Sequence, residues 1–166
     1  MSRKLSTMRT LEDIIRIAVN AHDGQKDMIG NPAVQHVLAV GLMGGNELEQ
    51  KAGYLHDVVE DTDLTIEDLR IDGVEEEVLT AVDLLTHRAG ISYERYVKNI
   101  VASGNEIAIH VKLNDLRHNL LRAEHSLGIL APTGSTQALY EEILQIAIKH
   151  DWAERFIRNS LAPSTN

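Results

Sequence analysis

The chain has 166 residues, of which 43% are hydrophobic and 4% aromatic, and it carries a formal net charge of −9 and no cysteine. This length and apolar content suit one domain over 1–166 and exclude an intrinsically disordered chain, while the few aromatics favour helices packed through aliphatic side chains. The charge disfavours general nucleic-acid binding, and the lack of cysteine excludes disulfides and thiolate metal sites.

Hydrophobic spacing along the chain predicts an all-α fold, because no segment shows the sustained alternation of a strand. The first helix should begin after Thr10, which can cap it, with Glu12 and Asp13 in its first turn. Glycines and a proline between 24 and 32 then break the chain into a loop. Further helices are expected at 34–43, 46–60, a short one after Thr65, 74–87, 92–101, 106–124 and 137–160.

His-Asp dipeptides occur three times, at 22–23, 56–57 and 150–151. His56-Asp57 lies in an apolar segment, where buried charges without a partner would be costly and a cation would supply that partner. Adjacent side chains on a helix diverge by about 100°, so an ion bound by both lies beside the helix and needs ligands from other helices. The 150–151 pair lies among charged residues and is expected at the surface, whereas the 22–23 pair suits capping or packing at a helix end.

A polar face is expected on the helix at 106–124. Lys112, Asp115 and Asn119 recur at spacings of three and four residues and therefore share that face. The ammonium could bind a phosphate, the carboxylate could bind a metal, and the amide could bind a ribose or base. The alternative is that this face is a solvated polar stripe. His36, which follows the first loop, would by itself be more typical of a core histidine than of a ligand.

A second candidate substrate patch follows the helix at 74–87. Arg88 could bind a phosphate, and Tyr93 could stack on a base. The alternative, which the pattern favours, places Arg88 at the negative end of the helix dipole and Tyr93 in the core.

Together, these motifs resemble the HD superfamily of metal-dependent phosphohydrolases. More narrowly, they are similar to the hydrolase domain of the bifunctional alarmone synthetase/hydrolases and to the small alarmone hydrolases. The motif core spans 21–122 in the family's order, and the ordered set is far more specific than any one motif. The matching segments are 21–25, 30–32 with His36, 55–62, and 111–115 with His118 and Asn119.

The resemblance implies one divalent ion, typically manganese, held by His36, His56, Asp57 and Asp115. Two imidazoles and two carboxylates suit manganese or iron and do not exclude another divalent transition metal such as zinc or nickel. Because the acidic chain would repel an anionic substrate, any phosphate chemistry here should need such a cation.

The same resemblance implies roles for residues beside the metal. Glu60 and Asp61 would orient or deprotonate the attacking water, because a carboxylate near a metal-activated water can accept its proton. Asn119 matches a family position that contacts the nucleoside, and Lys112 is a candidate phosphate contact.

The loop before His36 departs from the family pattern. Alarmone hydrolases carry an Arg-Lys pair there that helps to hold the guanine nucleotide, and here those positions are Asp27 and Met28. Lys26, one residue earlier, could substitute as a substrate contact. These departures leave the inferred metal ligands untouched, so they concern recognition of the base.

These features predict a manganese-dependent phosphohydrolase that acts on a small nucleotide, with removal of the 3′-pyrophosphate of guanosine 3′,5′-bis(diphosphate) as the leading expectation. The alternatives are an HD-type nucleotidase or phosphodiesterase for another phosphoester, and a non-catalytic nucleotide-binding HD module. No apolar run approaches a membrane span and no targeting segment is evident, so we expect a cytoplasmic protein without a membrane or nucleic-acid partner. The oligomeric state stays open.

Overall fold

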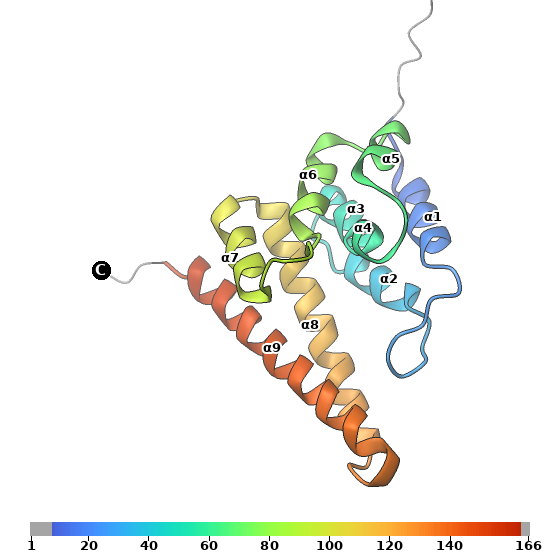
Figure 1. Ribbon diagram of the computed structural model, residues 1–166. Helices are drawn as coiled ribbons and strands as arrows, with labels where there is room; N and C mark the ends of the chain where they lie inside the picture. Colours follow the sequence, from blue (N-terminus) through green and yellow to red (C-terminus); the bar gives the residue numbers. More distant parts are fainter. Residues whose placement is uncertain (1–7, 164–166) are drawn as a thin grey trace, which may run out of the picture.

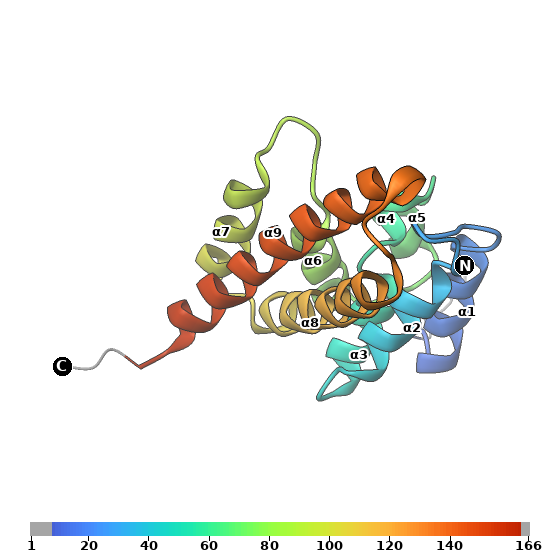
Figure 2. The same ribbon diagram turned by 90° about the horizontal axis from the view of Figure 1, so that it is seen from below.

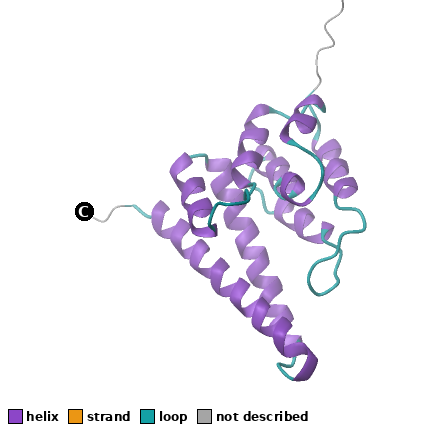
Figure 3. Cartoon of the chain, viewed as in Figure 1, coloured by secondary structure: helices purple, strands orange, loops and turns teal. Residues whose placement is uncertain are grey.

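The regular secondary structure is helical throughout. A computed structural model describes residues 8–163, and within this range it holds nine α-helices, one 3-10 helix and no β-strand (Figure 1, Figure 3). An isolated bridge between Lys26 and Pro32 closes the loop after the first helix. The all-α prediction is therefore confirmed. None of the helices in 8–163 combines the length and the apolar character that crossing a membrane requires.

The helices form two spatial groups. The first group is α1 (Leu11–Ala21), α2 (Val34–Leu42), α3 (Glu47–Leu55), α4 (Val58–Asp61), α5 (Ile66–Ile71) and α6 (Glu76–Leu85). The second group is α7 (Tyr93–Ser103), α8 (Glu106–Ile129), the 3-10 helix η1 (Gly134–Thr136) and α9 (Gln137–Leu161). Figure 1 and Figure 2 show α8 and α9 as a long antiparallel pair, with α7 beside α9 and the first group against α8.

Local capping signals in the sequence fix several helix ends. Thr10 caps α1, and its hydroxyl oxygen accepts the N–H of Asp13, whose carboxylate in turn accepts the N–H of Thr10. Such a reciprocal pair of hydrogen bonds is a capping box, and Thr65 and Asp68 form a second one at the start of α5. Gly104 ends α7 with a φ of 64°, a left-handed conformation that glycine adopts without strain. The predicted starts after Thr10 and Thr65 are confirmed, whereas α7 extends two residues beyond its predicted end at 101.

The helix predicted over 46–60 is wrong, because the chain breaks at His56-Asp57. Helix α3 ends at Leu55, and the short α4 starts at Val58. The Nδ1 atom of His56 lies 2.7 Å from the carbonyl oxygen of Gly53, which in a continuous helix would accept the N–H of Asp57. Because the helix is broken here, the side chains of His56 and Asp57 need not diverge by the 100° of a regular helix.

Helices α2 and α3 approach closely at two glycines. A Cβ atom on Gly41 would lie 2.2 Å from the Tyr54 ring, and one on Gly53 would lie 2.9 Å from the Cα atom of Gly41. Only hydrogen atoms fit at these positions. The close approach brings His36 on α2 next to His56 at the end of α3.

Candidate functional site

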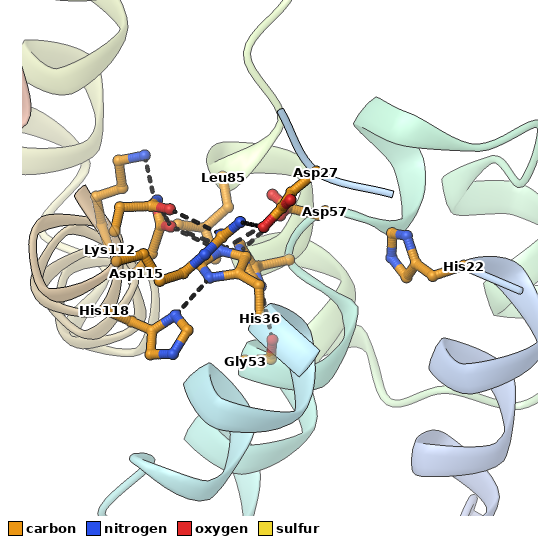
Figure 4. Close-up of polar contacts among 12 residues, drawn as sticks. His22, Asp27, His36, Gly53, Asp57, Leu85, Lys112, Asp115 and His118 are labelled. Atoms are coloured by element: carbon orange, nitrogen blue, oxygen red, sulfur yellow. Dashed lines mark hydrogen bonds and ion pairs between the residues drawn. The ribbon is translucent and has the colours of Figure 1, made fainter. Parts of the chain in front are cut away.

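Three buried side chains from three helices converge on one point. The ligand atoms of His36 from α2, His56 after α3 and Asp115 on α8 all lie within 4.8 Å of one another. The Nε2 atoms of the two histidines are 3.2 Å apart, and Asp115 Oδ1 lies 3.1 Å from His36 Nε2 and 3.7 Å from His56 Nε2 (Figure 4).

Asp57 adds a second carboxylate to this cluster. Its Oδ2 atom lies 3.1 Å from Nε2 of His56 and 3.6 Å from Nε2 of His36. Donor atoms bound at about 2.0–2.2 Å around one ion stand roughly 3–3.5 Å apart, so these spacings match a shared cation. The donor set therefore fits a divalent metal, and all four predicted ligands are brought together.

The outward-facing nitrogens of both histidines are held by hydrogen bonds. His56 Nδ1 donates to the Gly53 carbonyl at 2.7 Å, and His36 Nδ1 lies 2.8 Å from Nδ1 of His118. Burial, with His36 and Arg122 nearby, lowers the pKa of His118 to about 4, so His118 is neutral and can accept this bond. Metal-binding histidines are commonly oriented in this way, with Nε2 facing the ion.

Asp115 is anchored by two neighbours on its own helix. Lys112 Nζ donates to Oδ2 at 2.7 Å, and Asn119 Nδ2 donates to Oδ1 at 2.6 Å. Burial alone would raise the pKa of Asp115, but the Lys112 ammonium and the two histidines outweigh it and hold the pKa well below its usual range. Both Lys112 and Asp115 are buried, which excludes the solvated polar stripe for these two residues. Lys112 therefore forms a buried ion pair with Asp115. Its ammonium is 5.0 Å from the centre of the Tyr96 ring.

Glu60 and Asp61 lie on α4, beside the cluster. Burial raises the pKa of Glu60, and the negative charges of Asp57 and Asp61 add to this effect, although the N–H of His87 donates to its Oε2 atom at 2.8 Å and opposes it. Burial and the charge of Asp57 also raise the pKa of Asp61. A raised pKa makes each carboxylate a stronger base, which suits it to accept a proton from water.

The cluster opens into a cavity of about 280 Å³. The lining includes the four converging side chains with Glu60 and Asp61, and other lining residues come from α7, α8 and α9. The wall residues that carry polar groups are His87, Tyr93, Tyr96, Lys112, Asn119, Arg122, Lys149 and His150. A cavity of this size and lining can admit a phosphate group next to the four predicted metal ligands.

Comparisons with known proteins give one consistent answer, although no family model matches the chain. A GTP pyrophosphokinase of Streptomyces coelicolor is 34% identical over 130 residues, which are 69% of this chain and 15% of the relative. A guanosine-3′,5′-bis(diphosphate) 3′-pyrophosphohydrolase of Haemophilus influenzae is 31% identical over 164 residues, 87% of this chain and 23% of the relative. The chain thus spans less than a quarter of the length of these relatives.

The fold gives the same result. A solved chain described as a metazoan orthologue of SpoT that hydrolyses ppGpp superposes with a TM-score of 0.62 at 25% identity, covering 93% of this chain and 88% of that one. The chain is a RelA/SpoT homologue with an HD-type fold. The resemblance stated for its motifs is confirmed.

The sequence of this RelA/SpoT homologue predicts that His150 lies at the surface. The structure shows that this prediction is wrong. It lines the cavity, and its Nδ1 atom is buried without a hydrogen-bond partner among the described residues. Burial lowers the pKa of His150 to about 4, so the imidazole is neutral. The missed signal is its spacing of seven residues from both Ile143 and Ile157, which are buried on the same face of α9.

Lys149 is a second residue that sequence reasoning missed. Its ammonium lies 4.5 Å from the centre of the Tyr93 ring, a cation–π contact at the wall of the cavity. Burial lowers the pKa of Lys149. Helix α9 thus places one cation beside the acidic cluster.

Arg88 and Lys26 do not line the cavity that contains the predicted metal ligands. Arg88 is exposed and forms an ion pair with Asp83, whereas its neighbour His87 lines the cavity and stacks on Tyr96 with the ring centres 4.7 Å apart. Lys26 lines two neighbouring cavities in the first loop. Of the candidate substrate contacts, Lys112 and Asn119 are therefore in the cavity with the predicted metal ligands.

Proposed function

We propose that this protein is a manganese-dependent phosphohydrolase that removes the 3′-pyrophosphate of guanosine 3′,5′-bis(diphosphate). The observation that carries the proposal is the convergence of His36, His56, Asp57 and Asp115 in one cavity with the carboxylates of α4. The relatives named as 3′-pyrophosphohydrolases and the metazoan orthologue support the substrate.

The reaction adds one water and releases pyrophosphate and guanosine 5′-diphosphate. A bound divalent ion would supply Lewis acidity and charge neutralisation at the phosphoryl group. Glu60 and Asp61 would orient the water and accept its proton, and the backbone N–H of His87 would hold Glu60 in place for this step. Lys149, which lines the same cavity, would offset the negative charge of the substrate.

Manganese is the proposed metal because the donor set mixes two imidazoles with two carboxylates. Such a set suits manganese or iron, and it is less selective for zinc than a site with thiolates. Nδ1 of each histidine is already hydrogen-bonded, so both rings offer Nε2 to the ion.

The proposal is tested by chromatographic product analysis of metal-stripped protein with and without manganese. We expect pyrophosphate and guanosine 5′-diphosphate from guanosine 3′,5′-bis(diphosphate) only when manganese is restored. Absence of both products with every divalent metal tried would contradict the proposal.

The second candidate is an HD-type hydrolase for a different nucleotide or phosphoester. The observation that favours it is the acidic residue Asp27 in the recognition loop, where it pairs with Arg122. Turnover of another nucleotide in the same panel, without turnover of guanosine 3′,5′-bis(diphosphate), would support this second function.

A further inference from the structure

An ion pair joins the first loop to α8. Arg122 Nη2 donates to Oδ2 of Asp27 at 2.6 Å, and the two side chains are 33% and 11% exposed. The other oxygen of Asp27 accepts the backbone N–H groups of Ile29 at 3.0 Å and Asn31 at 2.8 Å. The carboxylate is therefore surrounded by donors that the protein itself supplies.

The two members of the pair differ in what they can offer to a ligand. Both oxygens of Asp27 are engaged. Burial alone would raise the pKa of this carboxyl, but the hydrogen bonds from Arg122, Asn31 and Ile29 outweigh it and lower the pKa. Arg122 has five N–H donors and uses one toward Asp27 and one, at 3.3 Å, toward Asn119. Arg122 thus retains donors for a ligand, whereas Asp27 fixes its position.

Arg122 lies where three cavities meet. It lines the metal cavity of about 280 Å³, a cavity of about 450 Å³ that also reaches His36 and Asp57, and a third of about 320 Å³ between the loop, α8 and α9. Asn119 is shared between the metal cavity and the third one. A substrate with its phosphate at the metal can therefore extend past Arg122 into the third cavity.

Apolar atoms form most of the surface of the third cavity, and its polar lining residues are Lys26, Asp27, Asn119, Arg122 and Ser126. Its apolar residues are Met28, Ile29, Ala123, Ile143 and Ile146. The apolar residues can pack against the faces of a flat base. The free N–H groups of Arg122 would meet the edge of that base.

We propose that Arg122 determines base specificity by donating to the O6 and N7 atoms of a 6-oxopurine, and that Asp27 is its positioning residue. A guanidinium can bond both acceptors of guanine at once, whereas adenine presents an N6 amine donor at the O6 position. This inference rests on the proposed function, because it places the phosphate of the same nucleotide at the metal.

The test compares kcat/KM for the guanosine, inosine and adenosine 3′,5′-bis(diphosphates) with manganese. The wild type should favour guanosine and inosine over adenosine. Arg122→Gln should reduce that preference by about 10- to 100-fold, since one bidentate base contact is worth roughly 1–3 kcal/mol of discrimination. Arg117→Gln, an equal change of charge at an exposed position of α8, should leave the preference unchanged.

Two further variants separate recognition from folding. Arg122→Lys keeps the charge beside Asp27 but loses the planar pair of donors, so it should fold and still lose the preference. Asp27→Asn should weaken the preference less than Arg122→Gln does, mainly through KM. A preference that survives in both Arg122 variants, or that depends on Lys26→Gln instead, would overturn the proposal.

A failure of the proposed function is distinguishable from a failure of this inference. If the wild type hydrolyses none of the three nucleotides, equilibrium binding of guanosine and adenosine 5′-diphosphate to the manganese-loaded protein replaces turnover. The inference then requires tighter binding of the guanosine compound, and loss of that difference in Arg122→Gln. Equal binding of both compounds by the wild type would overturn it.

Discussion

At the scale of single residues, the proposed metal site is a set of donors held close together by their surroundings. Burial alone would lower the pKa of His56, but the charges of Asp57 and Asp115 outweigh it and raise the pKa to about 9 without a metal. A proton on Nε2 must leave before that nitrogen can bind an ion. Metal binding is therefore coupled to proton release.

This coupling predicts that manganese affinity rises with pH. Below the raised pKa of about 9, each binding event displaces a proton from His56, so the apparent affinity should increase up to about tenfold per pH unit between pH 7 and 9. Calorimetry in two buffers with different ionisation enthalpies measures the released proton. An affinity independent of pH over this range would contradict the raised pKa.

The carboxylate of Glu60 is predicted to act on the water and not on the metal. Glu60→Gln should lower kcat by about 10²- to 10⁴-fold, the usual contribution of a general base, while the dissociation constant for manganese stays within a few-fold. Glu124→Gln, an exposed carboxylate on α8, is the matched control. Full turnover by a metal-loaded Glu60→Gln enzyme would rule out this role.

At the scale of elements, the site depends on how closely α2 and α3 approach. Gly41→Ala would place a Cβ atom 2.2 Å from the Tyr54 ring and push the two helices apart. We expect a loss of stability of about 1–3 kcal/mol and weaker manganese binding, because His36 moves away from His56. Thermal unfolding and a manganese titration measure the two effects.

The control for this variant is a glycine with free space around it. A Cβ atom on Gly128 of α8 meets no atom within 4 Å, so Gly128→Ala should keep the manganese affinity and stabilise the protein by up to about 1 kcal/mol. If both alanine variants behave alike, the close approach at Gly41 is not what positions the histidines.

The sequence predicted those elements whose signals are local. The boxes at Thr10 and Thr65 need residues only three positions apart, so their helices were placed correctly. The break at His56-Asp57 was missed because it depends on a side chain that bonds a backbone carbonyl. The contact of His36 with His118 spans 82 positions, and only the packing of α2 against α8 reveals it.

At the scale of the whole molecule, the ligands come from helices far apart in the sequence, so an ion bound by all of them should stabilise the fold. Manganese at 100 times its dissociation constant should add about 2.7 kcal/mol. For a chain of this size, that corresponds to a rise in Tm of roughly 5–10 °C. Differential scanning calorimetry with manganese and with a chelator measures the shift.

The same scan tests the expectation that 1–166 forms one domain, which should unfold in a single transition. Asp57→Asn should reduce the manganese-dependent rise in Tm, because one donor of the cluster is weakened. A Tm that manganese does not change would contradict the proposed metal site.

The most direct test of the central claim is hydrolysis in ¹⁸O-labelled water, followed by mass spectrometry of the products. With manganese, guanosine 3′,5′-bis(diphosphate) should yield pyrophosphate that carries one labelled oxygen and guanosine 5′-diphosphate that carries none, because water attacks phosphorus and the bond to the ribose oxygen breaks. With chelator, no product should form. Unlabelled pyrophosphate would contradict attack of water on phosphorus, and equal release with and without manganese would contradict metal-dependent hydrolysis.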